Sequence, residues 1–411
     1  MSSAVPDGWV STTIGEATSE ISDGGTPATS NAEYFNGSIP WIVIDDIQPR
    51  IVHTKSSITE LGLQKSSAKL WDKGTIILST GATIGEVGIA MKVMATKQGI
   101  CGVVVKSDVS AKYFYHLLIS KKRQLNILSQ GSTIKETRPP TVKKIQICLP
   151  PLPEQKKIAS ILTSVDEVIE NTQKQIDKLQ DLKKATMNEL LTKGIGHTEF
   201  KDSELGRIPK SWEVVELGEL SDVTKLAGFE YTEHFDYSIG GEIIALRVLN
   251  LDGGKLDLTN IQTIPKSVSE ALPRSKLFYG DILISYVGSI GDLGFIYDND
   301  RFHLAPNVAK ISCNLSKVSA QFILQQLLSA RAQKNIEVLT TITSQPSLNM
   351  ANIRKIRLLV CPLNEQDKIV EVLSSLDIKT DNLRNKLSQT QSLKKSLMQD
   401  LLTGKVRVTV N

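Results

Sequence analysis

The sequence predicts an α+β fold: two pseudo-two-fold-related α/β domains separated by two long helices that form an antiparallel coiled coil. Three observations lead to this prediction. One long helical pattern occurs twice in the chain, the segments before the two copies repeat one another in order, and both segments mix strand and helix signals. With 411 residues, the chain is also longer than one typical hydrophobic core, which favours two or three domains.

The long helices are expected at residues 154–193 and 365–403. In both stretches apolar residues recur at steps of three and four, and neither stretch contains a glycine or a proline. Each pattern therefore predicts an uninterrupted helix of about 40 residues, roughly 60 Å long at 1.5 Å per residue. The first pattern has one polar break, at Thr172.

A helix of this length with one apolar face is not stable alone in water. Two matched copies can bury their faces against each other as a coiled coil, and an antiparallel pairing is favoured because each copy follows a large globular segment. The alternative is that each helix belongs to a bundle in its own separate core. The residues expected to pack between the helices are Ile158, Ile161, Val165, Val168, Ile176, Leu179, Ile369, Val372, Leu376, Leu383 and Leu387.

The duplication extends beyond the helices. Three anchors carry it: Trp9 and Trp212 at an offset of 203 (212 − 9), Gly85 and Gly291 at an offset of 206 (291 − 85), and Glu154 and Glu365 at an offset of 211 (365 − 154). The drift in offset indicates small insertions in the second half, all before its helix. The chain therefore contains a duplicated unit of about 200 residues, within the usual size of a domain.

Each unit begins with a mixed globular segment. β-branched runs with turn residues on both sides predict strands at 39–47, 75–80 and 99–105 in the first unit, and at 242–251, 281–287 and 308–313 in the second. An amphipathic helix (111–128, 319–339) and a last strand (144–149, 355–361) follow in each. The predicted domains are residues 1–153 and 194–364, with helices at 154–193 and, with a C-terminal tail, 365–411. Residues 194–210 are expected to be a connector with little core of its own.

The composition, 40% hydrophobic and 22% charged, is typical of a soluble globular protein. No apolar run approaches the roughly 20 residues that span a bilayer, and residues 1–10 lack the features of a signal peptide. We therefore expect a cytoplasmic protein without a membrane partner. The net charge of +4 is too small to argue for or against nucleic acid.

Several catalytic or metal-binding classes lack their residue signatures. The four cysteines lie far apart in apolar runs without a CxxC pair, so buried reduced thiols are expected and metal ligation is the alternative. No histidine has a partner at metal or triad spacing. The Asp45-Asp46 pair is read as a solvated strand end rather than a nuclease metal site. The Pro-Pro pairs do not form the Asn/Asp-Pro-Pro-aromatic motif of an amino-methyltransferase acting on DNA.

The glycine-containing segments 81–88 and 288–294 could suggest a phosphate-binding loop. They lack the glycine pattern of a dinucleotide site and the Gly-Lys-Ser/Thr of a P-loop, and they lie between two strand-like runs. A tight connection between β-strands is the favoured interpretation, and a cofactor loop is the alternative.

The evidence for DNA lies in polar and basic residues in expected loops. Lys and Arg bind phosphates, whereas Arg, Asn and Gln can form paired hydrogen bonds with base edges. For any one residue a solvated surface role is the alternative. The candidates are Arg50, Lys55, Lys65, Lys69, Lys97, Gln98, Ser132, Thr133, Lys135 and Arg138 in the first unit, and Arg247, Asn250, Lys266, Arg274, Lys276, Asn307, Ser344 and Gln345 in the second.

Together these features resemble the specificity subunit of Type I restriction-modification systems. No single motif is decisive, but the resemblance covers the whole chain and its duplicated order. The residues that carry it are Gly24–Pro27, Tyr34-Phe35, Ile39–Trp41, the Ser/Thr-Ile-Gly-Glu/Asp turns, Pro151–Gln155, Asp202–Pro209 and Leu401–Val408.

The resemblance implies a non-catalytic subunit with two target recognition domains, each reading one half of a bipartite, asymmetric double-stranded DNA target. It also implies that the two long helices act as a spacer that fixes the gap between the two half-sites. It implies two modification subunits that methylate adenine and restriction subunits that cut DNA. S-adenosylmethionine, ATP and magnesium are then expected in these partners, so no cofactor is expected in this chain.

The two units differ where base contacts are expected. The loop before the last strand is basic in the first unit, with Lys135 and Arg138, whereas Ser344–Leu348 in the second is uncharged. The Gly-Gly-Thr-Pro motif also has no second copy. Different half-sites follow from such a difference. The alternative functions are a coiled-coil scaffold that binds protein partners without reading DNA, and an autonomous methyltransferase.

Overall fold

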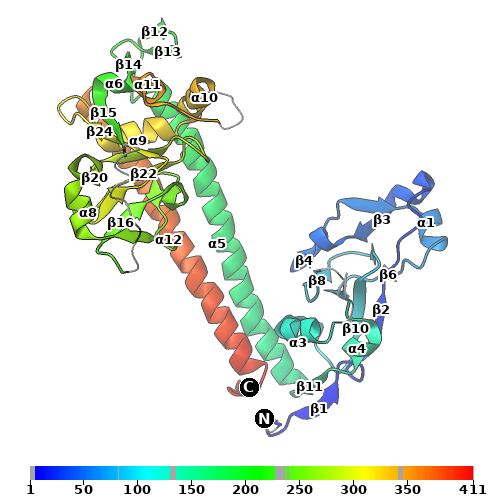
Figure 1. Cartoon of the computed structure of the whole chain (residues 1–411). Coiled ribbons are helices and arrows are strands. Elements are labelled where there is room, and N and C mark those ends of the chain that lie inside the picture. Colours follow the sequence, from blue (N-terminus) through cyan, green and yellow to red (C-terminus); the bar gives the residue numbers. More distant parts are fainter. Residues whose placement is uncertain are drawn as a thin grey trace. The chain divides into compact units, whose positions relative to one another are not determined.

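The computed structural model describes residues 5–81, 83–129, 136–226, 237, 240–340 and 346–410. Its contacts divide the chain into two compact units (Figure 1). Unit 1 comprises Met1–Lys174 with Arg384–Asn411, and unit 2 comprises Gln175–Leu383. The division passes through both long helices, so each unit contains a globular domain and one half of each helix. The predicted domain limits at residues 153, 193 and 364 stay a prediction.

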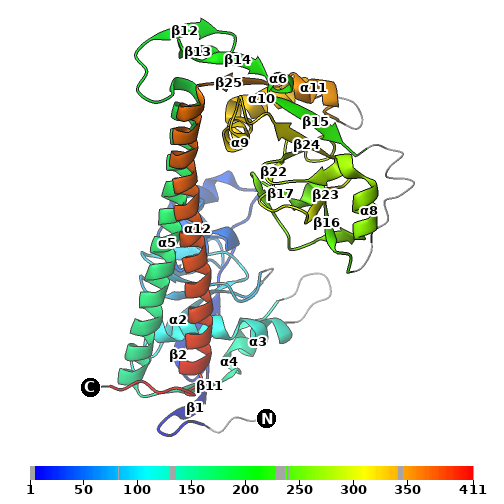
Figure 2. The ribbon, with the colours of Figure 1, turned by 90° about the vertical axis from the view of Figure 1, so that its left-hand side faces the viewer.

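The two long helices are present as expected. Helix α5 spans Leu152–Lys193 with 42 residues, and α12 spans Leu363–Leu401 with 39 residues. They lie side by side in both views (Figure 1, Figure 2). No helix in the described ranges is long and apolar enough to cross a membrane.

Two equivalent ion pairs show that the helices are antiparallel and in a fixed register. In unit 1, Asp166 of α5 lies 2.5 Å from Lys394 of α12, and in unit 2 Lys183 of α5 lies 2.7 Å from Asp377 of α12. The helix offset of 211 relates these pairs (166 + 211 = 377; 183 + 211 = 394). Their side chains are only 20–30% exposed. Such half-buried pairs disfavour sliding of one helix along the other, because a shift would separate the charges.

The packing between the helices is partly apolar. Ile158, Ile176, Ile369 and Leu376 are buried. Val168 and Val372 are 42% and 41% exposed, so their predicted role in the packing seam was wrong. Both follow the helical period, but neither face is covered by the neighbouring helix or domain. Ile161, Val165, Leu179, Leu383 and Leu387 are partly buried.

Two threonines occupy buried positions within the seam. Thr172, expected only as a polar break, is 3% exposed, and its hydroxyl donates to the Val168 carbonyl (2.7 Å). Thr380 does the same to the Leu376 carbonyl (2.8 Å). Because the hydroxyl bonds to its own helix, a polar residue is accommodated without an unpaired donor.

In its described residues, the domain of unit 1 contains two larger sheets, one two-stranded sheet and four short helices. A five-stranded sheet has the order β2 (Thr18–Asp23), β10 (Ile100–Val105), β7 (Ile76–Ser79), β8 (Val87–Ala90) and β4 (Arg50–Ile51). A four-stranded sheet has the order β5 (Ser56–Ile58), β3 (Phe35–Ile42), β9 (Met94–Thr96) and β6 (Leu70–Trp71). Strand β1 (Val10–Thr13) pairs with β11 (Gln146–Leu149). The helices are α1 (Glu60–Gln64), α2 (Ala111–Ser120), α3 (Lys122–Ile127) and α4 (Pro139–Lys143).

The domain of unit 2 repeats this topology, which confirms the duplication. One sheet has the order β15 (Ser221–Lys225), β24 (Val308–Cys313), β21 (Ile282–Ser285) and β22 (Leu293–Phe295). The other has the order β19 (Gln262–Ile264), β16 (Ile243–Leu246), β23 (Phe302–Leu304) and β20 (Lys276–Leu277). Strand β14 (Glu213–Glu216) pairs with β25 (Arg357–Val360), and β17 (Leu251–Asp252) with β18 (Lys255–Leu256). The helices are α6 (Leu217–Leu220), α8 (Lys266–Ala271), α9 (Ala320–Leu328), α10 (Ala330–Leu339) and α11 (Met350–Arg354).

Each predicted helix before the last strand is two helices. Lys121 separates α2 from α3. In unit 2, Ser329 leaves the helical conformation (φ −66°, ψ 147°), and its hydroxyl caps α10 by accepting from the Ala332 N–H (3.2 Å). A serine can cap a helix in this way, so an amphipathic pattern that continues through it does not guarantee one helix.

Two predicted strands end earlier than expected, for one shared reason. Residues 44–46 and 248–250 form 3₁₀ turns, held by a side chain at the third position. In unit 1 the Asp46 carboxylate accepts from the Val43 N–H (3.0 Å) and the Lys55 N–H (3.1 Å). Asp46 is therefore buried and structural, so its interpretation as a solvated strand end was wrong.

The predicted connector has more structure than expected. Strands β12 (Phe200–Ser203) and β13 (Gly206–Pro209) form a hairpin. The chain on either side is attached to the start of α12 through Glu365, which accepts from the Ile195 N–H (2.9 Å), from His197 Nε2 (2.8 Å) and from Trp212 Nε1 (3.1 Å). At the repeat position, Glu154 accepts two hydrogen bonds from the Arg407 guanidinium (2.7 and 2.8 Å).

Candidate nucleic-acid interface

One end of the five-stranded sheet gathers three loops of unit 1. The Thr80 and Gly81 N–H groups both donate to the Gly99 carbonyl (2.9 and 3.0 Å). The Thr137 N–H donates to the Thr80 carbonyl (2.8 Å). The turn after β7, the turn before β10 and the segment before α4 therefore meet at one sheet end. We call this group of loops the sheet-end surface of unit 1.

Three predicted DNA contacts lie on the sheet-end surface. Lys97 and Gln98 are exposed in the turn before β10, and Arg138 is exposed next to Thr137. Arg138 Nε lies 3.8 Å from a carboxylate oxygen of Glu136, an exposed pair that contributes little to stability. Residues 40 apart in sequence thus share one surface, with a cation and an amide that can approach a phosphate and a base edge.

The Gly24-Gly25 segment packs against the turn before β10 and holds it in place. A β-carbon on Gly24 would lie 2.2 Å from the Thr96 carbonyl oxygen, so only glycine fits against the turn before β10. Asp23 accepts from the N–H groups of Gly99 (2.9 Å) and Gly24 (3.0 Å), while its burial raises the pKa of its carboxyl. The Trp41 indole donates to the Gly25 carbonyl (3.1 Å). The Gly-Gly-Thr-Pro motif therefore positions the loops rather than forming a cofactor site.

The glycine turns are β-connections, as the sequence favours. Segment 80–86 joins the antiparallel strands β7 and β8, and segment 286–292 joins β21 and β22. In unit 1 the Ser79 hydroxyl donates to the Thr83 carbonyl and accepts from the Glu86 N–H (2.8 Å). Ser285 makes the equivalent contacts with Ser289 and Asp292. A hydroxyl that bridges each turn explains the repeated Ser…Ile-Gly-acid pattern.

The sheet-end surface of unit 2 is built in the same way with different side chains. The Tyr286 N–H donates to the Asn307 carbonyl (3.0 Å), and the Leu348 N–H to the Tyr286 carbonyl (2.9 Å). Asn307 is exposed and has φ +69°, where Gly99 of unit 1 has φ +82°. Asparagine tolerates this left-handed backbone, so the turn is kept while an amide is added at its tip.

Lys225 is a basic residue of this surface that the sequence argument missed. It is exposed, ends β15 opposite Ala309, and its ammonium lies 5.4 Å from the centre of the Tyr286 ring. It lies just before the residues that follow β15, whose sequence has no clear hydrophobic period and no recognisable loop motif. A cation held over an aromatic ring at this edge adds a phosphate or base contact to the set.

Two predicted contacts of unit 2 are occupied within the fold. Asn250 is fully buried, and its amide donates to the carbonyls of Asp257 (2.8 Å) and Asn260 (2.9 Å). Its oxygen accepts from the Arg247 N–H (3.0 Å). Arg247 itself donates to the Asn260 carbonyl (3.0 Å). Asn250 therefore holds a turn, and its prediction as a DNA contact was wrong; Arg247 is tied to the same turn.

The other basic candidates lie outside the loops that define the two sheet-end surfaces. Lys55 is exposed, 3.8 Å from the Asp45 carboxylate, and Lys65 is exposed at the end of α1. Lys69 pairs with Glu20 and lies 5.1 Å from the centre of the Trp71 ring. In unit 2, Lys266 and Arg274 are exposed and Lys276 is half-buried. Ser132, Thr133, Lys135, Ser344 and Gln345 lie outside the described residues.

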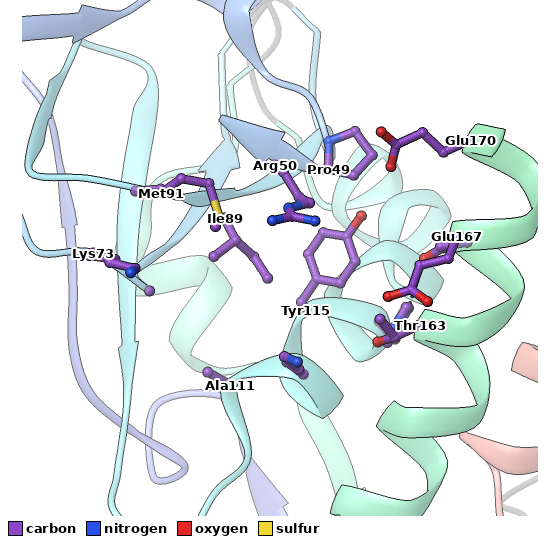
Figure 3. A pocket seen from close by; sticks show the side chains of 15 residues that line it. Pro49, Arg50, Lys73, Ile89, Met91, Ala111, Tyr115, Thr163, Glu167 and Glu170 are labelled. Carbon is purple, nitrogen blue, oxygen red and sulfur yellow. Dashed lines mark ion pairs between the residues drawn. The ribbon is translucent and has the colours of Figure 1, made fainter. Parts of the chain in front are cut away.

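Arg50 is exposed and lines a pocket of unit 1 (Figure 3). The pocket, of about 430 Å³, is bounded by the β4–β8 edge, by α2 and by α5. The Tyr115 ring lies between Arg50 and the Glu167 side chain of α5, with Glu170 above them. His116 lines the same pocket. Its burial and the nearby Lys394 charge lower the pKa of its imidazole to about 3, so it is neutral at physiological pH.

The cysteines are thiols, but two of the four are less buried than expected. All four are free; Cys101 and Cys361 are buried, whereas Cys148 and Cys313 are half-buried. Burial raises the pKa values of the Cys101 and Cys313 thiols to about 12. No group of three His, Cys, Asp or Glu side chains in the described ranges is arranged to hold a metal ion.

The family model described as "Type I restriction modification DNA specificity domain" matches this chain twice, over residues 6–181 and 209–391. A similar relative is the Type I restriction enzyme MjaVIII specificity subunit of Methanocaldococcus jannaschii, 29% identical over 98% of this chain and 94% of the relative. The putative MjaX specificity subunit of the same organism is 32% identical over 74% of this chain and 70% of the relative. The EcoBI specificity subunit of Escherichia coli is 24% identical, over 75% and 68%.

Two solved structures share the fold. The S subunit of a Type-I restriction-modification system from M. genitalium has a TM-score of 0.61 and 17% identity, covering 100% of this chain and 99% of that one. A chain from a study of complex assembly and conformational transition of the type I R-M system has a TM-score of 0.59 and 16% identity, covering 98% and 100%.

Proposed function

This chain belongs to the Type I restriction-modification DNA specificity family, and from that premise we propose how its two domains divide the reading of DNA. Each domain presents its sheet-end surface to one half of a bipartite, asymmetric target. The observation that carries this proposal is the repeated topology with unlike loops. The turn carries the exposed Lys97 and Gln98 in unit 1, whereas in unit 2 it carries the exposed Asn307, at the position of Gly99.

The chain directs chemistry that other subunits perform. In this proposal it has no catalytic activity, and two modification subunits bind S-adenosylmethionine and methylate adenine in the target. Restriction subunits then use ATP and magnesium to translocate and cut DNA when the target is unmodified. The proposal places the chain in the cytoplasm with its DNA, in agreement with four free cysteines.

The test is a selection from a random duplex library by the purified full chain together with its modification subunits. We expect enrichment of one bipartite sequence whose two halves differ. Binding should weaken steeply between low and moderate salt, because cations released from the phosphates compete with the protein. Enrichment no better than that of random DNA, with binding insensitive to salt, would instead favour a coiled-coil scaffold for proteins.

Single substitutions should relax one half-site at a time. Gln98→Ala removes an amide from unit 1, and Asn307→Gly removes one from unit 2 while keeping the left-handed turn that Gly99 shows to be compatible with the fold. We expect each to lose discrimination at one or two base pairs of one half-site, about 1–3 kcal/mol for a lost paired contact. Sequencing the enriched duplexes measures this.

Lys106→Ala is the matched control, since Lys106 is exposed and follows β10 at the end opposite to the turn that holds Gln98. It should leave the consensus unchanged. If Gln98→Ala and Asn307→Gly altered the same half-site, or neither altered any base preference, the assignment of one sheet-end surface to each half-site would be wrong.

A further inference from the structure

Unit 2 contains a second pocket, of about 630 Å³, between one face of α5 and the junction of α9 with α10. It is separate from the sheet-end surface. The α5 residues lie three or four positions apart and so share one face of the helix. The lining residues used below are Asp181, Lys184, Met187, Leu191, Gln326, Leu328, Ala330 and Arg331.

Two buried hydrogen-bond donors of this pocket lack acceptors. Gln326 is 3% exposed, and its Nε2 has no partner in the part of the chain that the structure describes. The same holds for Nη1 of Arg331. Burial lowers the pKa of the Arg331 guanidinium, although arginine keeps its charge in proteins. An unsatisfied buried donor costs free energy, which an acceptor from outside the chain would recover.

The first turn of α10 adds backbone donors at the same place. Ser329 caps the ten-residue helix by accepting from the Ala332 N–H, which satisfies one of its first free N–H groups. The N–H groups of Ala330 and Arg331, in the same turn, have no acceptor within the helix. The positive end of the helix dipole therefore adds to the field of the Arg331 guanidinium.

The charge and the apolar lining limit what can bind. Lys184 and Arg331 supply two positive charges against the exposed Asp181, a net of +1 (2 − 1). Met187, Leu191 and Leu328 make much of the remaining wall apolar. A singly charged, planar acceptor on an aliphatic stem matches both features. A phosphate, with more charge and no apolar part, matches them less well.

We propose that this pocket binds a carboxylate on a short aliphatic stem, of the kind presented by a glutamate side chain of a partner polypeptide. Arg331 and Gln326 donate to the carboxylate oxygens, and the stem lies against the apolar wall. The inference rests on the proposed function in one respect: it requires that this chain binds partner polypeptides. It can therefore fail while the DNA-reading proposal stands.

The repeat supplies an internal comparison. Ser110 and Ser319 both cap their helices and donate their N–H groups to Gln155 and Gln366, an offset of 209 (319 − 110). This offset places Leu117 at the position of Gln326 (117 + 209 = 326). Leu117 is 3% exposed and belongs to the core of unit 1. The buried amide is thus not a requirement of the fold but a feature of the second unit.

The experiment uses the full chain with methyl-labelled Met, Leu and Ala, titrated with valerate and with neutral valeramide. We expect saturable shifts of the Met187, Leu191, Leu328 and Ala330 methyl signals with valerate, and at least 10-fold weaker binding of valeramide. A short peptide with a central glutamate should bind, and its glutamine counterpart should not. Inorganic phosphate binding better than valerate, or valerate binding without the glutamate peptide, would overturn the proposal.

Gln326→Leu introduces the residue type found at the matching position of unit 1, Leu117, and should weaken valerate binding at least 10-fold. Gln325→Leu is the matched control: Gln325 is also a buried glutamine with an unpaired oxygen, but it does not line the pocket. It should bind valerate like the parent chain. Arg331→Gln provides a second test should Gln326→Leu fail to fold. Equal affinities in Gln326→Leu, Arg331→Gln and Gln325→Leu would refute the site, while unchanged DNA selection by Gln326→Leu is expected either way.

Discussion

Insertion of seven residues into each long helix is expected to lengthen the gap between the two half-sites by about 3 base pairs. Seven residues add about 10 Å at 1.5 Å per residue, and one base pair rises 3.4 Å. The insertions belong between Lys174 and Gln175 and between Asn385 and Lys386. Both ion pairs join residues whose numbers add to 560 (166 + 394; 183 + 377). By the same sum, Lys174 lies opposite Lys386 and Gln175 lies opposite Asn385, so the two insertions lie opposite each other.

The measurement is selection from a random duplex library by the variant with both insertions, and the quantity compared is the gap between the enriched half-sites. A full heptad preserves the seam, since the apolar positions of a coiled coil repeat every seven residues. A heptad in α5 alone is the control. It should misalign Asp166 with Lys394 or Lys183 with Asp377, and lower the melting temperature without producing a new defined gap. Unchanged spacing in the double insertion would exclude a spacer role for the helices.

Replacement of Glu365 by alanine is expected to destabilise unit 2 by about 3 kcal/mol, the range for loss of charge-assisted bonds that leaves a buried donor unpaired. Its carboxylate accepts from Ile195, His197 and Trp212, and the Trp212 indole is fully buried. Gly194 packs against Glu365, where a β-carbon would lie 2.4 Å from Oε1. One side chain thus ties the connector to the start of α12.

Urea titration followed by hydrogen exchange of peptides from residues 194–213 measures this loss for unit 2 alone. Glu154→Ala is the matched control at the repeat position. Its partner, Arg407, is 43% exposed and can be rehydrated, so we expect a smaller loss, confined to unit 1. Equal losses in the two variants would mean that burial of Trp212 does not set the cost.

Much of the architecture could be predicted from sequence because the signals are long or repeated. The helices α5 and α12 carry an unbroken period over about 40 residues, and three anchors at similar offsets reveal the duplication. Element ends were less predictable. Ser329 interrupts a continuous amphipathic pattern by capping α10, and the Asp46 carboxylate ends a strand early by holding a 3₁₀ turn. Such local hydrogen bonds are not visible in hydrophobic periodicity.

The candidate interface was less predictable than the fold. Lys97, Gln98 and Arg138 are individually ordinary loop residues, and only the hydrogen bonds of Thr80 and Gly81 to Gly99 and of Thr137 to Thr80 bring them together. Asn250 was also assigned wrongly from its residue type. Its amide could bind an adenine edge, but it donates to two backbone carbonyls instead. Lys225 was missed because its importance comes from the Tyr286 ring beside it.

By itself the sequence determined the duplication, the two long helices and the class of fold, because each of these depends on patterns repeated along the chain. Tertiary structure alone decided which side chains share a surface and which polar groups remain unpaired. Those properties depend on contacts between residues distant in sequence, such as Asp166 with Lys394, or the α5 residues that line one pocket together with Gln326 and Arg331. Two copies of one pattern, with unlike loops, could therefore be recognised from sequence, while the grouping of those loops at each sheet end and the pocket of unit 2 could not.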